Sequence, residues 1–589
     1  MNHFKNSLFT LFFIGIFSWT NAQSNLLQYI PSDATFVFSM NPNNLNSKVN
    51  LRQLKEYDFY NMAMMQMAGS MGAGSEEIMD VLADPETIGL DLMSSSHFFG
   101  KIKDNKTQFG FLFNVSDETK FTSFLKEVNP QGFEGNQYSK QPGYNLMKVS
   151  EDAWFSWNGE MAFIGGCEIE MDVDWDDNEA VKELEKIQEE VTADLMSETM
   201  GRTATNSIKS HNRYKLATTK PADMHFWMDY SFINEFMKEG MMEGMPSGLE
   251  GISPEIMMNL MKTFSEDTHL SMGLNFDKGK IALSTEMFPN KDMLELTKSM
   301  GDHKFNKKLT RYLRGEELLG YMSMSMSTEK MMDGYEKLIR SKLNEIPMYG
   351  DMASSAMDIA GIFYDERAIP NLFKGDFVMA FTGMQKVKKT ITDYEYDEDF
   401  NATEVQKTIE QDIPEVTMVW THGSKEDWMK FIRLGLKSAF LESAGNHYKV
   451  MVPGFDFDAY VVLKDNMLFL TNSADLVQNR LSKGYPRKQR VSKKHCEMMA
   501  QNTVAMHWDI PNTLSVFGNE AGAAMGVGEF VNMGKQNFES IQITSARTTG
   551  NSVKGEFSIN FVKKDENSLK QIFEMVNEVF LGMMGGSKS

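Results

Sequence analysis

The chain has 589 residues, of which 59 are lysine or arginine and 81 are aspartate or glutamate, so its formal net charge is −22. A field of that sign repels nucleic-acid phosphates and anionic lipid headgroups, which makes both of them poor candidate partners. The apolar fraction of 42% and the charged fraction of 24% are ordinary for a globular protein and argue against global disorder.

Residues 1–22 are predicted to be a secretory signal peptide. Lys5 supplies the positive charge, residues 8–19 form a short apolar run, and Thr20-Asn-Ala22 is a small-residue cleavage site. The run is too short to span a bilayer, and no later segment has eighteen uncharged apolar residues. No cysteine lies near the cleavage site. We therefore expect a periplasmic or secreted protein that carries no lipid anchor and does not span the membrane after cleavage; the alternative is an N-terminal anchor helix.

Cys167 and Cys496 are the only cysteines. In an oxidising compartment they could pair, or they could be two small buried side chains. The second reading is favoured because two cysteines do not make a disulfide framework.

One pattern recurs four times along the chain. A short alternating apolar run, beginning at residues 33, 223, 318 and 504, is followed by a helical stretch rich in methionine and glycine, a strand pair and an amphipathic helix. The recurrence predicts two related α+β halves, residues 23–304 and 305–589. Each half is expected to consist of two related units.

Turn and capping signals give more detail. Asn158-Gly159 between 154–157 and 161–164 predicts a β-hairpin, with a counterpart at 460–470. Ser116 and Ser424 are predicted helix N-caps, and 390–413 reads as an acidic excursion between two strands. Short turns between strands indicate an internally duplicated α+β fold, with mostly antiparallel sheets covered by amphipathic helices.

The start of the predicted mature chain resembles an uncharacterised exported family of Bacteroidetes. The similarity lies in Ile30-Pro-Ser-Asp-Ala-Thr35, the alternating strand after it, and the polar stretch Asn44-Leu-Asn-Ser-Lys48. Many members of that family carry a lipobox cysteine, which this sequence lacks. The resemblance implies a location and a fold, and it implies no known reaction.

Methionine is the compositional anomaly, with 49 residues. Methionines cluster in the helical stretch of each repeated unit, and some follow helical spacing, so they share one face. Thioether side chains are flexible and polarisable, which suits a surface that accepts variable apolar shapes; the alternative is plain packing on the sheet. The predicted ligand or partner face comprises Tyr57, Tyr60, Met64, Met67, Met71, Met241, Met242 and Met245.

Two possible metal-binding sites have less support from the sequence than the ligand or partner face. Met322-Ser-Met-Ser-Met326 places three sulfurs on one strand face, which would suit Cu(I), although no histidine neighbours the run. A calcium-loop spacing occurs at Asp172, Asp174, Asp176 and Glu183, but the position that needs glycine is Asp177, so helix capping is the favoured interpretation. No cofactor is expected.

No catalytic constellation stands out. Ser327 and Lys330 form an S-x-x-K at a strand-to-helix junction, without the partner motifs of acyl-transfer enzymes, and Ser327 is explained as a helix cap. We therefore expect a non-catalytic exported envelope protein that binds an apolar ligand or a protein partner, or acts as a scaffold. The alternatives are a hydrolase with an unrecognised site and a copper- or calcium-binding protein.

Overall fold

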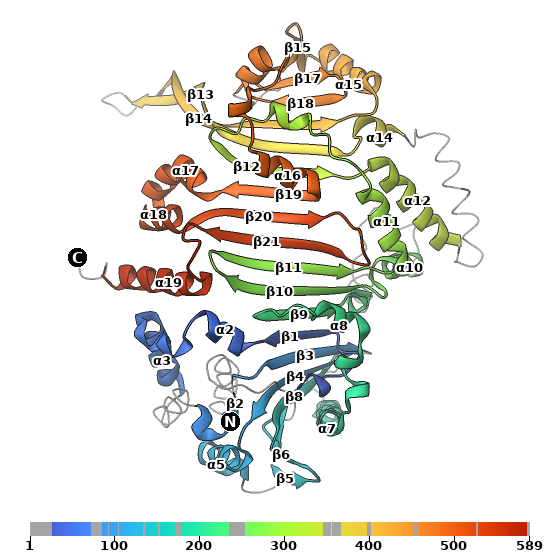
Figure 1. The fold of residues 1–589 in the computed structure, drawn as a ribbon, viewed down its shortest axis with the longest axis vertical. Coiled ribbons are helices and arrows are strands. Elements are labelled where there is room, and N and C mark those ends of the chain that lie inside the picture. Colours follow the sequence, from blue (N-terminus) through green and yellow to red (C-terminus); the bar gives the residue numbers. More distant parts are fainter. Residues whose placement is uncertain are drawn as a thin grey trace. The chain divides into compact units, whose positions relative to one another are not determined.

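The chain folds into two compact units, shown in Figure 1. Unit 1 comprises Met1–Asn290 with Lys563–Ser589, and unit 2 comprises Lys291–Val562. The predicted α+β class is confirmed. The computed structural model describes residues 26–585 except 72–84, 92, 104, 134–136, 151–152, 172–177, 235–253, 345–354, 356–366, 397–401, 452–456 and 526–527, so the predicted signal peptide lies outside the described residues.

Unit 1 contains one antiparallel sheet. Its strands follow the hydrogen-bonded order β5 (Tyr138–Gln141), β6 (Tyr144–Lys148), β7 (Ala153–Trp157), β8 (Met161–Ile169), β4 (Lys106–Val115), β3 (Ser96–Lys103), β1 (Phe36–Met40), β9 (Met224–Asp229), β10 (His269–Asp277) and β11 (Lys280–Phe288). The short β2 (Leu90–Asp91) pairs with the end of β4. The predicted hairpin at Asn158 is present as β7 and β8.

Unit 2 has a sheet of the same order. Its strands are β15 (Leu441–Ser443), β16 (Tyr448–Val450), β17 (Tyr460–Lys464), β18 (Met467–Thr471), β14 (Ala402–Thr421), β13 (Asp376–Tyr396), β12 (Leu318–Ser325), β19 (Asn502–Asp509), β20 (Phe538–Ala546) and β21 (Val553–Phe561). Each strand therefore has a topological counterpart in unit 1, so that β1 corresponds to β12 and β9 to β19.

The compact units do not follow the predicted halves residue for residue. Helix α11 (Lys291–Gly301) comes after the last strand of unit 1 but belongs to unit 2, and α19 (Ser568–Gly585) comes after the last strand of unit 2 but belongs to unit 1. The division into halves at 304/305 stays a prediction.

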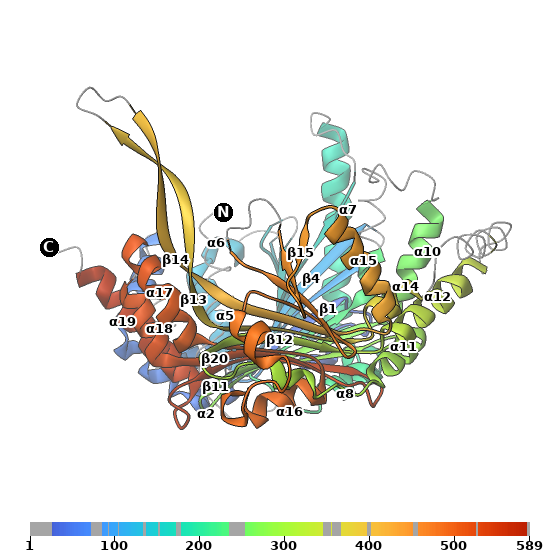
Figure 2. The same ribbon diagram turned by 90° about the horizontal axis from the view of Figure 1, so that it is seen from above.

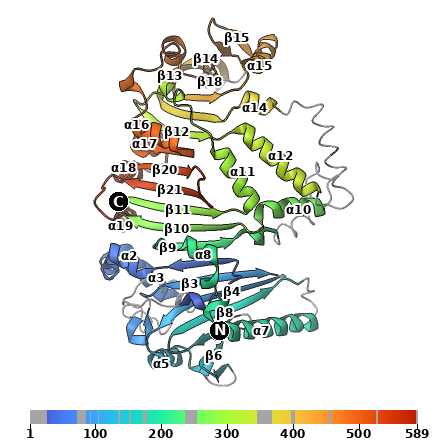
Figure 3. The ribbon, with the colours of Figure 1, turned by 45° about the vertical axis from the view of Figure 1, so that its right-hand side comes forward.

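The other helices of unit 1 lie between its strands in the sequence. They are η1 (Leu26–Gln28), α2 (Pro42–Lys48), η2 (Leu51–Glu56), α3 (Asp58–Met71), η3 (Pro85–Ile88), α5 (Glu118–Val128), α6 (Pro130–Phe133), α7 (Asn178–Gly201), η4 (Ala204–Asn206), η5 (Ile208–Ser210), α8 (Asn212–Ala217), η6 (Tyr230–Phe232) and α10 (Pro254–Ser265). Figure 3 shows α7 beside β8, against which it packs. The N-cap of α5 is Asp117 and not the predicted Ser116, because the Asp117 carboxylate accepts hydrogen bonds from the amides of Thr119 and Lys120.

Unit 2 uses a corresponding set of helices. They are α11, η7 (Leu309–Tyr312), α12 (Thr328–Asn344), α14 (Ala368–Leu372), α15 (Lys425–Lys437), the π-helical turn η8 (Leu476–Arg480), η9 (Arg487–Gln489), α16 (Lys493–Gln501), α17 (Ile510–Met525) and α18 (Gly528–Asn537). The hydroxyls of Ser424 and Ser327 accept hydrogen bonds from the amides of Asp427 and Lys330, as expected of helix caps. Helices α11 and α12 lie side by side (Figure 3).

The described residues of the predicted excursion 390–413 are strand residues. Strands β13 and β14 continue through it and pair with each other from Met384↔Pro414 to Tyr396↔Ala402. They form a two-stranded ribbon that extends beyond the rest of the unit 2 sheet (Figure 2). The acidic residues suggested an excursion between two strands, but Val387, Ile391, Val405 and Ile409 are interspersed with them and favour a strand. Residues 397–401, between the two strands in the sequence, lie outside the described residues.

Each sheet has one face that is buried over its central strands. In unit 1 this face includes Val37, Phe99 and Leu112, which are 0% exposed and belong to one apolar cluster. In unit 2, Val378, Val419 and Phe469 are likewise 0% exposed. Helix α16 packs on this side of β12 and β19, and Figure 2 shows it beneath the sheet.

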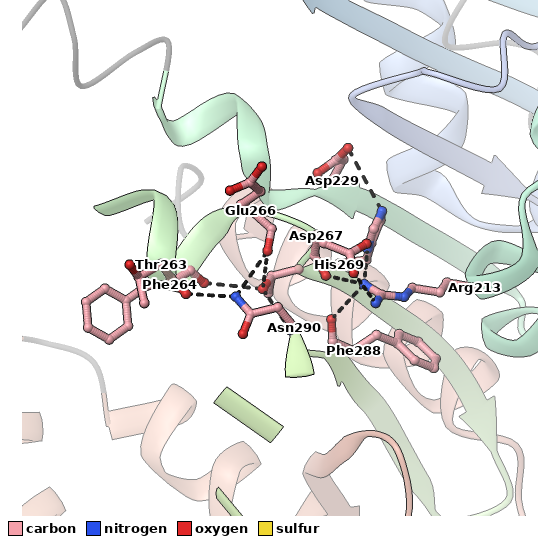
Figure 4. A network of polar contacts seen from close by, with 10 residues as sticks. Arg213, Asp229, Thr263, Phe264, Glu266, Asp267, His269, Phe288 and Asn290 are labelled. Carbon is pink, nitrogen blue, oxygen red and sulfur yellow. Dashed lines mark hydrogen bonds and ion pairs between the residues drawn. The ribbon is translucent and has the colours of Figure 1, made fainter. Parts of the chain in front are cut away.

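A polar network ties α10 of unit 1 to the ends of the neighbouring strands (Figure 4). The side-chain amide of Asn290 donates to the carbonyl oxygens of Thr263, at 2.7 Å, and Glu266, at 3.1 Å. The Arg213 guanidinium donates to the Asp267 carboxylate at 2.7 Å and contacts Nδ1 of His269 at 2.9 Å. The Asn290 contacts supply donors to carbonyls at the end of α10, where the helix itself offers none.

Candidate functional site

The second face of each sheet carries large apolar side chains that remain partly exposed to solvent. On β12 of unit 2, Tyr321 and Ser323 point to the buried face, whereas Met322 and Met324 are 39% and 40% exposed. This alternation follows from the two-residue period of a strand. We call this second face the open face of each unit.

Four methionines form a row across the open face of unit 2. Met506 on β19 lies directly opposite Met322 on β12, which lies opposite Met379 on β13, which lies opposite Met418 on β14. Met379, Met418 and Met506 are half-buried. Directly paired residues have Cβ atoms about 4.5–5.5 Å apart, so the four thioethers are immediate neighbours. We call them the methionine row.

Aromatic side chains lie on both sides of the methionine row. On one side, Trp508 of β19 and Phe381 of β13 are both paired with Gly320 of β12, and their rings are 5.3 Å apart. On the other side, Phe377 is paired with Trp420, and their rings are 6.4 Å apart. Rings at these distances make favourable edge and offset contacts. The open face of unit 2 is thus an apolar surface made of sulfur and aromatic groups.

The corresponding row of unit 1 consists of phenylalanines. Phe226 on β9 lies opposite Phe38 on β1, Phe38 opposite Phe98 on β3, and Phe98 opposite Phe111 on β4. Phe38 is 37% exposed, and the others are half-buried. These strands are the topological counterparts of those that carry the methionine row. We call these four residues the phenylalanine row.

Helices of unit 1 cover one end of its open face. Met40 and Leu45 are buried against Leu569 of α19, with Met224 and Phe573 packed around them. The predicted site residue Tyr57 also lies here, and its ring is 6.0 Å from that of Phe573. Burial raises the pKa of the Tyr57 phenol and that of Tyr60.

The other predicted members of the ligand face divide into two groups. Met64 is half-buried and packs against the aromatic cluster of β4 and α5, which fits the packing alternative for this residue. The remaining side chains lie outside the described residues: Met67, Met71, Met241, Met242 and Met245. A binding role for this set therefore stays a prediction.

The structure describes only part of the calcium candidate, and it describes both thiols. Asp172, Asp174 and Asp176 lie outside the described residues, and Glu183 is an exposed residue of α7. Within the part of the chain that the structure describes, no three His, Cys, Asp or Glu side chains are arranged to hold a metal ion. Cys167 is a buried free thiol whose pKa is raised by burial, and Cys496 is a half-buried free thiol.

Two serine–histidine contacts lie inside the unit 1 sheet. Nδ1 of His97 is 2.8 Å from Oγ of Ser39, and Nε2 of His225 is 2.9 Å from Oγ of Ser271. Burial lowers the pKa of His97 to about 3, with a further contribution from His225, and the pKa of His225 to about 4. Both imidazoles are therefore neutral at pH 7 and lie in the interior of the sheet.

Helices α11 and α12 of unit 2 border a hollow of about 550 Å³. Its wall combines Leu296 and Leu338 with the charged groups of Glu295, Lys330 and Lys337. Gly334 makes room for Leu296, since a Cβ there would come within 2.3 Å of that side chain. This hollow lacks the convergent buried polar groups that orient a small substrate.

The open faces were not found from the sequence. Met322 and Met324 were recognised as sharing a strand face, and this is confirmed, although Met326 lies past the end of β12. The partners of Met322 both follow it in the sequence: Met379 on β13 comes 57 residues later and Met506 on β19 comes 184 residues later. Alternation within each strand was a usable signal, but no local pattern gives the register between strands.

The fold and the open faces define an α+β protein built on antiparallel sheets that present apolar side chains on one side. The chain belongs to the family described as domain of unknown function DUF4836, whose pattern matches residues 27–569. No curated protein matches the sequence. Among the described residues, none of the helices is both long and apolar enough to cross a membrane.

Solved structures offer only a distant similarity. Two crystal forms of TP0453, forms IV and I, share 8% and 9% sequence identity with this chain, each with a TM-score of 0.23. The matches cover 48% and 49% of this chain and 88% and 84% of those chains.

Proposed function

We propose that this is a non-catalytic exported protein that binds an amphipathic, basic segment of a protein partner on its open faces. The observation that carries the proposal is the partial exposure of the methionine row and the phenylalanine row, which are paired strand by strand across each sheet. Contiguous exposed apolar surface of this kind marks interaction sites.

The shape and charge of the surface favour this occupant. A small ligand is usually enclosed in a concave pocket, whereas Met322, Met324 and Phe38 each retain 37–40% of their surface exposed on a sheet. Methionine adapts to different apolar shapes, as at surfaces that bind amphipathic helices. The net charge of −22 attracts a partner whose polar side is basic and repels an acidic one.

Two further observations support the non-catalytic and exported parts of the proposal. The serine–histidine contacts of unit 1 are buried, with histidine pKa values of about 3 and 4, far from the value that suits a general base at neutral pH. The predicted signal at residues 1–22 supports export. The matching strand order of the two units supports an internal repeat.

The binding experiment uses a fluorescent amphipathic helical peptide with lysines on its polar side. Wild-type protein is compared with the double variant Met322→Asn/Met324→Asn, which places two polar groups on the open face of unit 2. We expect a dissociation constant at least about 10-fold higher for the variant, since each of the two substitutions near the centre of an interface should cost about 1 kcal/mol or more, and about 1.4 kcal/mol corresponds to a factor of 10.

Leu434→Asn is the matched control, because Leu434 is 64% exposed on α15 and is not a member of the methionine row. It should bind the peptide like wild type. A glutamate-substituted peptide tests the charge argument and should bind more weakly. Equal binding to the wild type and the double variant would overturn the proposal, and so would preference for uncharged lipid vesicles over the basic peptide.

A further inference from the structure

The methionine row of unit 2 has a property that the phenylalanine row of unit 1 lacks, although both are apolar. Each methionine ends in a thioether, which is a soft, uncharged ligand suited to Cu(I) and poorly suited to Mg²⁺ or Ca²⁺. We propose that Met506, Met322 and Met379 form a binding site for a soft monovalent cation, Cu(I) or its analogue Ag(I). This goes beyond the proposed binding of a protein partner.

The register places these sulfurs within reach of one ion. Met322 is the central residue, since it is directly paired with Met506 on one side and Met379 on the other. Cβ atoms of directly paired residues are about 4.5–5.5 Å apart. Each side chain has three rotatable bonds between Cα and the terminal methyl group, so the sulfurs can converge over the central strand without movement of the backbone.

Two more thioethers adjoin the same place. Met418 continues the row on β14, opposite Met379. Met324 follows Met322 on the same face of β12 and is 40% exposed. A site with this surplus of ligands tolerates loss of a peripheral sulfur better than loss of the central one.

The surroundings select for charge as well as softness. Neutral thioethers cannot compensate a doubly charged ion, and the nearby rings of Trp508, Phe381 and Phe377 offer little to replace its water shell. A monovalent ion costs less to desolvate and also gains from the electron-rich faces of aromatic rings. The net charge of −22 raises the local concentration of cations of either kind. The site should therefore prefer Cu(I) and Ag(I) to Zn²⁺ and Cu²⁺.

The test is a titration of the full chain with Cu(I) under anaerobic conditions, against a chromophoric Cu(I) chelator as competitor, repeated with Ag(I). The double variant Met322→Leu/Met379→Leu removes two sulfurs and keeps the apolar surface, because leucine and methionine are similar in volume. We expect Cu(I) affinity to fall by at least about 10-fold, as even loss of an outer partner of a metal site costs about 10–100-fold.

Unit 1 supplies the internal control. Phe38→Leu/Phe226→Leu changes the phenylalanine row by the same kind of substitution, and it should leave Cu(I) affinity unchanged. Circular dichroism checks that each variant is folded, and X-ray absorption of the Cu(I) complex should show sulfur neighbours only. Absence of Cu(I) binding by the wild type would overturn the inference, as would equal affinity in the methionine variant.

The outcome is separable from that of the proposed partner binding. The leucine variant retains an apolar open face and should still bind the basic amphipathic peptide, whereas Met322→Asn/Met324→Asn should lose the peptide. If the leucine variant lost both activities, the Cu(I) result would reflect a damaged surface and the cation site would be rejected.

Discussion

The indole of Trp508 on β19 lies directly over Gly320 on β12. A Cβ atom at position 320 would approach Cε3 of this ring to 2.3 Å and the His507 carbonyl oxygen to 2.8 Å. Unit 1 repeats the relationship, since a Cβ at Gly100 of β3 would come within 2.3 Å of the ring of Phe36. In each unit, a glycine on one strand lets a large ring of the open face lie flat across the sheet.

Gly320→Ala should therefore destabilise unit 2. The added methyl group must push the indole aside or shift the strand, and forced overpacking of this kind costs about 1–3 kcal/mol. The measurement is the free energy of unfolding from urea titration. Gly550→Ala is the matched control because no atom lies within 4 Å of a Cβ there. Equal stability of the two variants would show that Trp508 does not depend on the glycine.

A buried ion pair in unit 1 gives the second prediction. Lys48, at the end of α2, donates to the Asp223 carboxylate at 2.7 Å, and the Asp223 side chain is 0% exposed. Lys48→Met leaves that carboxylate buried without its cation and should cost about 3–5 kcal/mol in unfolding free energy.

The control for this prediction comes from the same sequence pattern. Asp33 precedes β1 as Asp223 precedes β9, but its partner Lys101 contacts it at the surface, where Asp33 is 57% exposed. Lys101→Met should cost no more than about 1 kcal/mol. Combining Lys48→Met with Asp223→Asn should restore much of the lost stability, because the uncompensated charge is then gone. No rescue in the double variant would argue against a charge effect.

Part of the fold was predictable because its signals are local. The Asn158-Gly159 turn, the Ser424 cap and the alternation of Met322 with Ser323 each depend on a few neighbouring residues. The cap of α5 was misplaced by one residue because Ser116 and Asp117 are both good caps, and the choice depends on which side chain reaches the helical amides.

The open faces could not be predicted from the sequence because they depend on the register between neighbouring strands. Met322 alone is one exposed strand residue, and it becomes part of a row only when β13 and β19 bring Met379 and Met506 beside it. A shift of either strand by one residue would turn those methionines into the core. The methionines of α3 were predicted to form a binding face instead, because residues that share one face of a helix can be recognised from their spacing in the sequence alone.

The β13–β14 ribbon gives the third prediction. Beyond Met384↔Pro414, the described parts of the two strands pair only with each other. Removing 386–412 and joining Gln385 to Ile413 through two glycines should leave the rest of unit 2 folded, with a change in melting temperature of less than about 5 °C. Hydrogen exchange in the intact protein should be faster in 386–396 than in 376–382, because an isolated two-stranded hairpin is marginally stable. A large drop in melting temperature would show that the ribbon supports the sheet.

The buried histidines predict how stability depends on pH. Burial lowers the pKa of His97 to about 3 and holds the pKa values of His225, His269 and His507 at about 4, against a usual value of 6.5. Below pH 6.5 the unfolded chain therefore binds protons that the folded chain does not. The stability from these groups is fully present above pH 6.5 and is lost as the pH falls toward 4. Within that window each such histidine contributes a slope of about 1.4 kcal/mol per pH unit.

Urea unfolding at pH 7, 6 and 5 measures this slope. His97→Gln retains a side chain that can hydrogen-bond to Ser39 but cannot take up a proton. The slope of the unfolding free energy against pH should therefore decrease by up to about 1.4 kcal/mol per pH unit, the contribution of one proton. His447→Gln is the control, because His447 lies in a surface hairpin and contacts Asn446, and its substitution should leave the slope unchanged. If stability were flat between pH 7 and 5, the four imidazoles would have to be protonated in the folded protein as readily as in the unfolded chain, which their burial opposes.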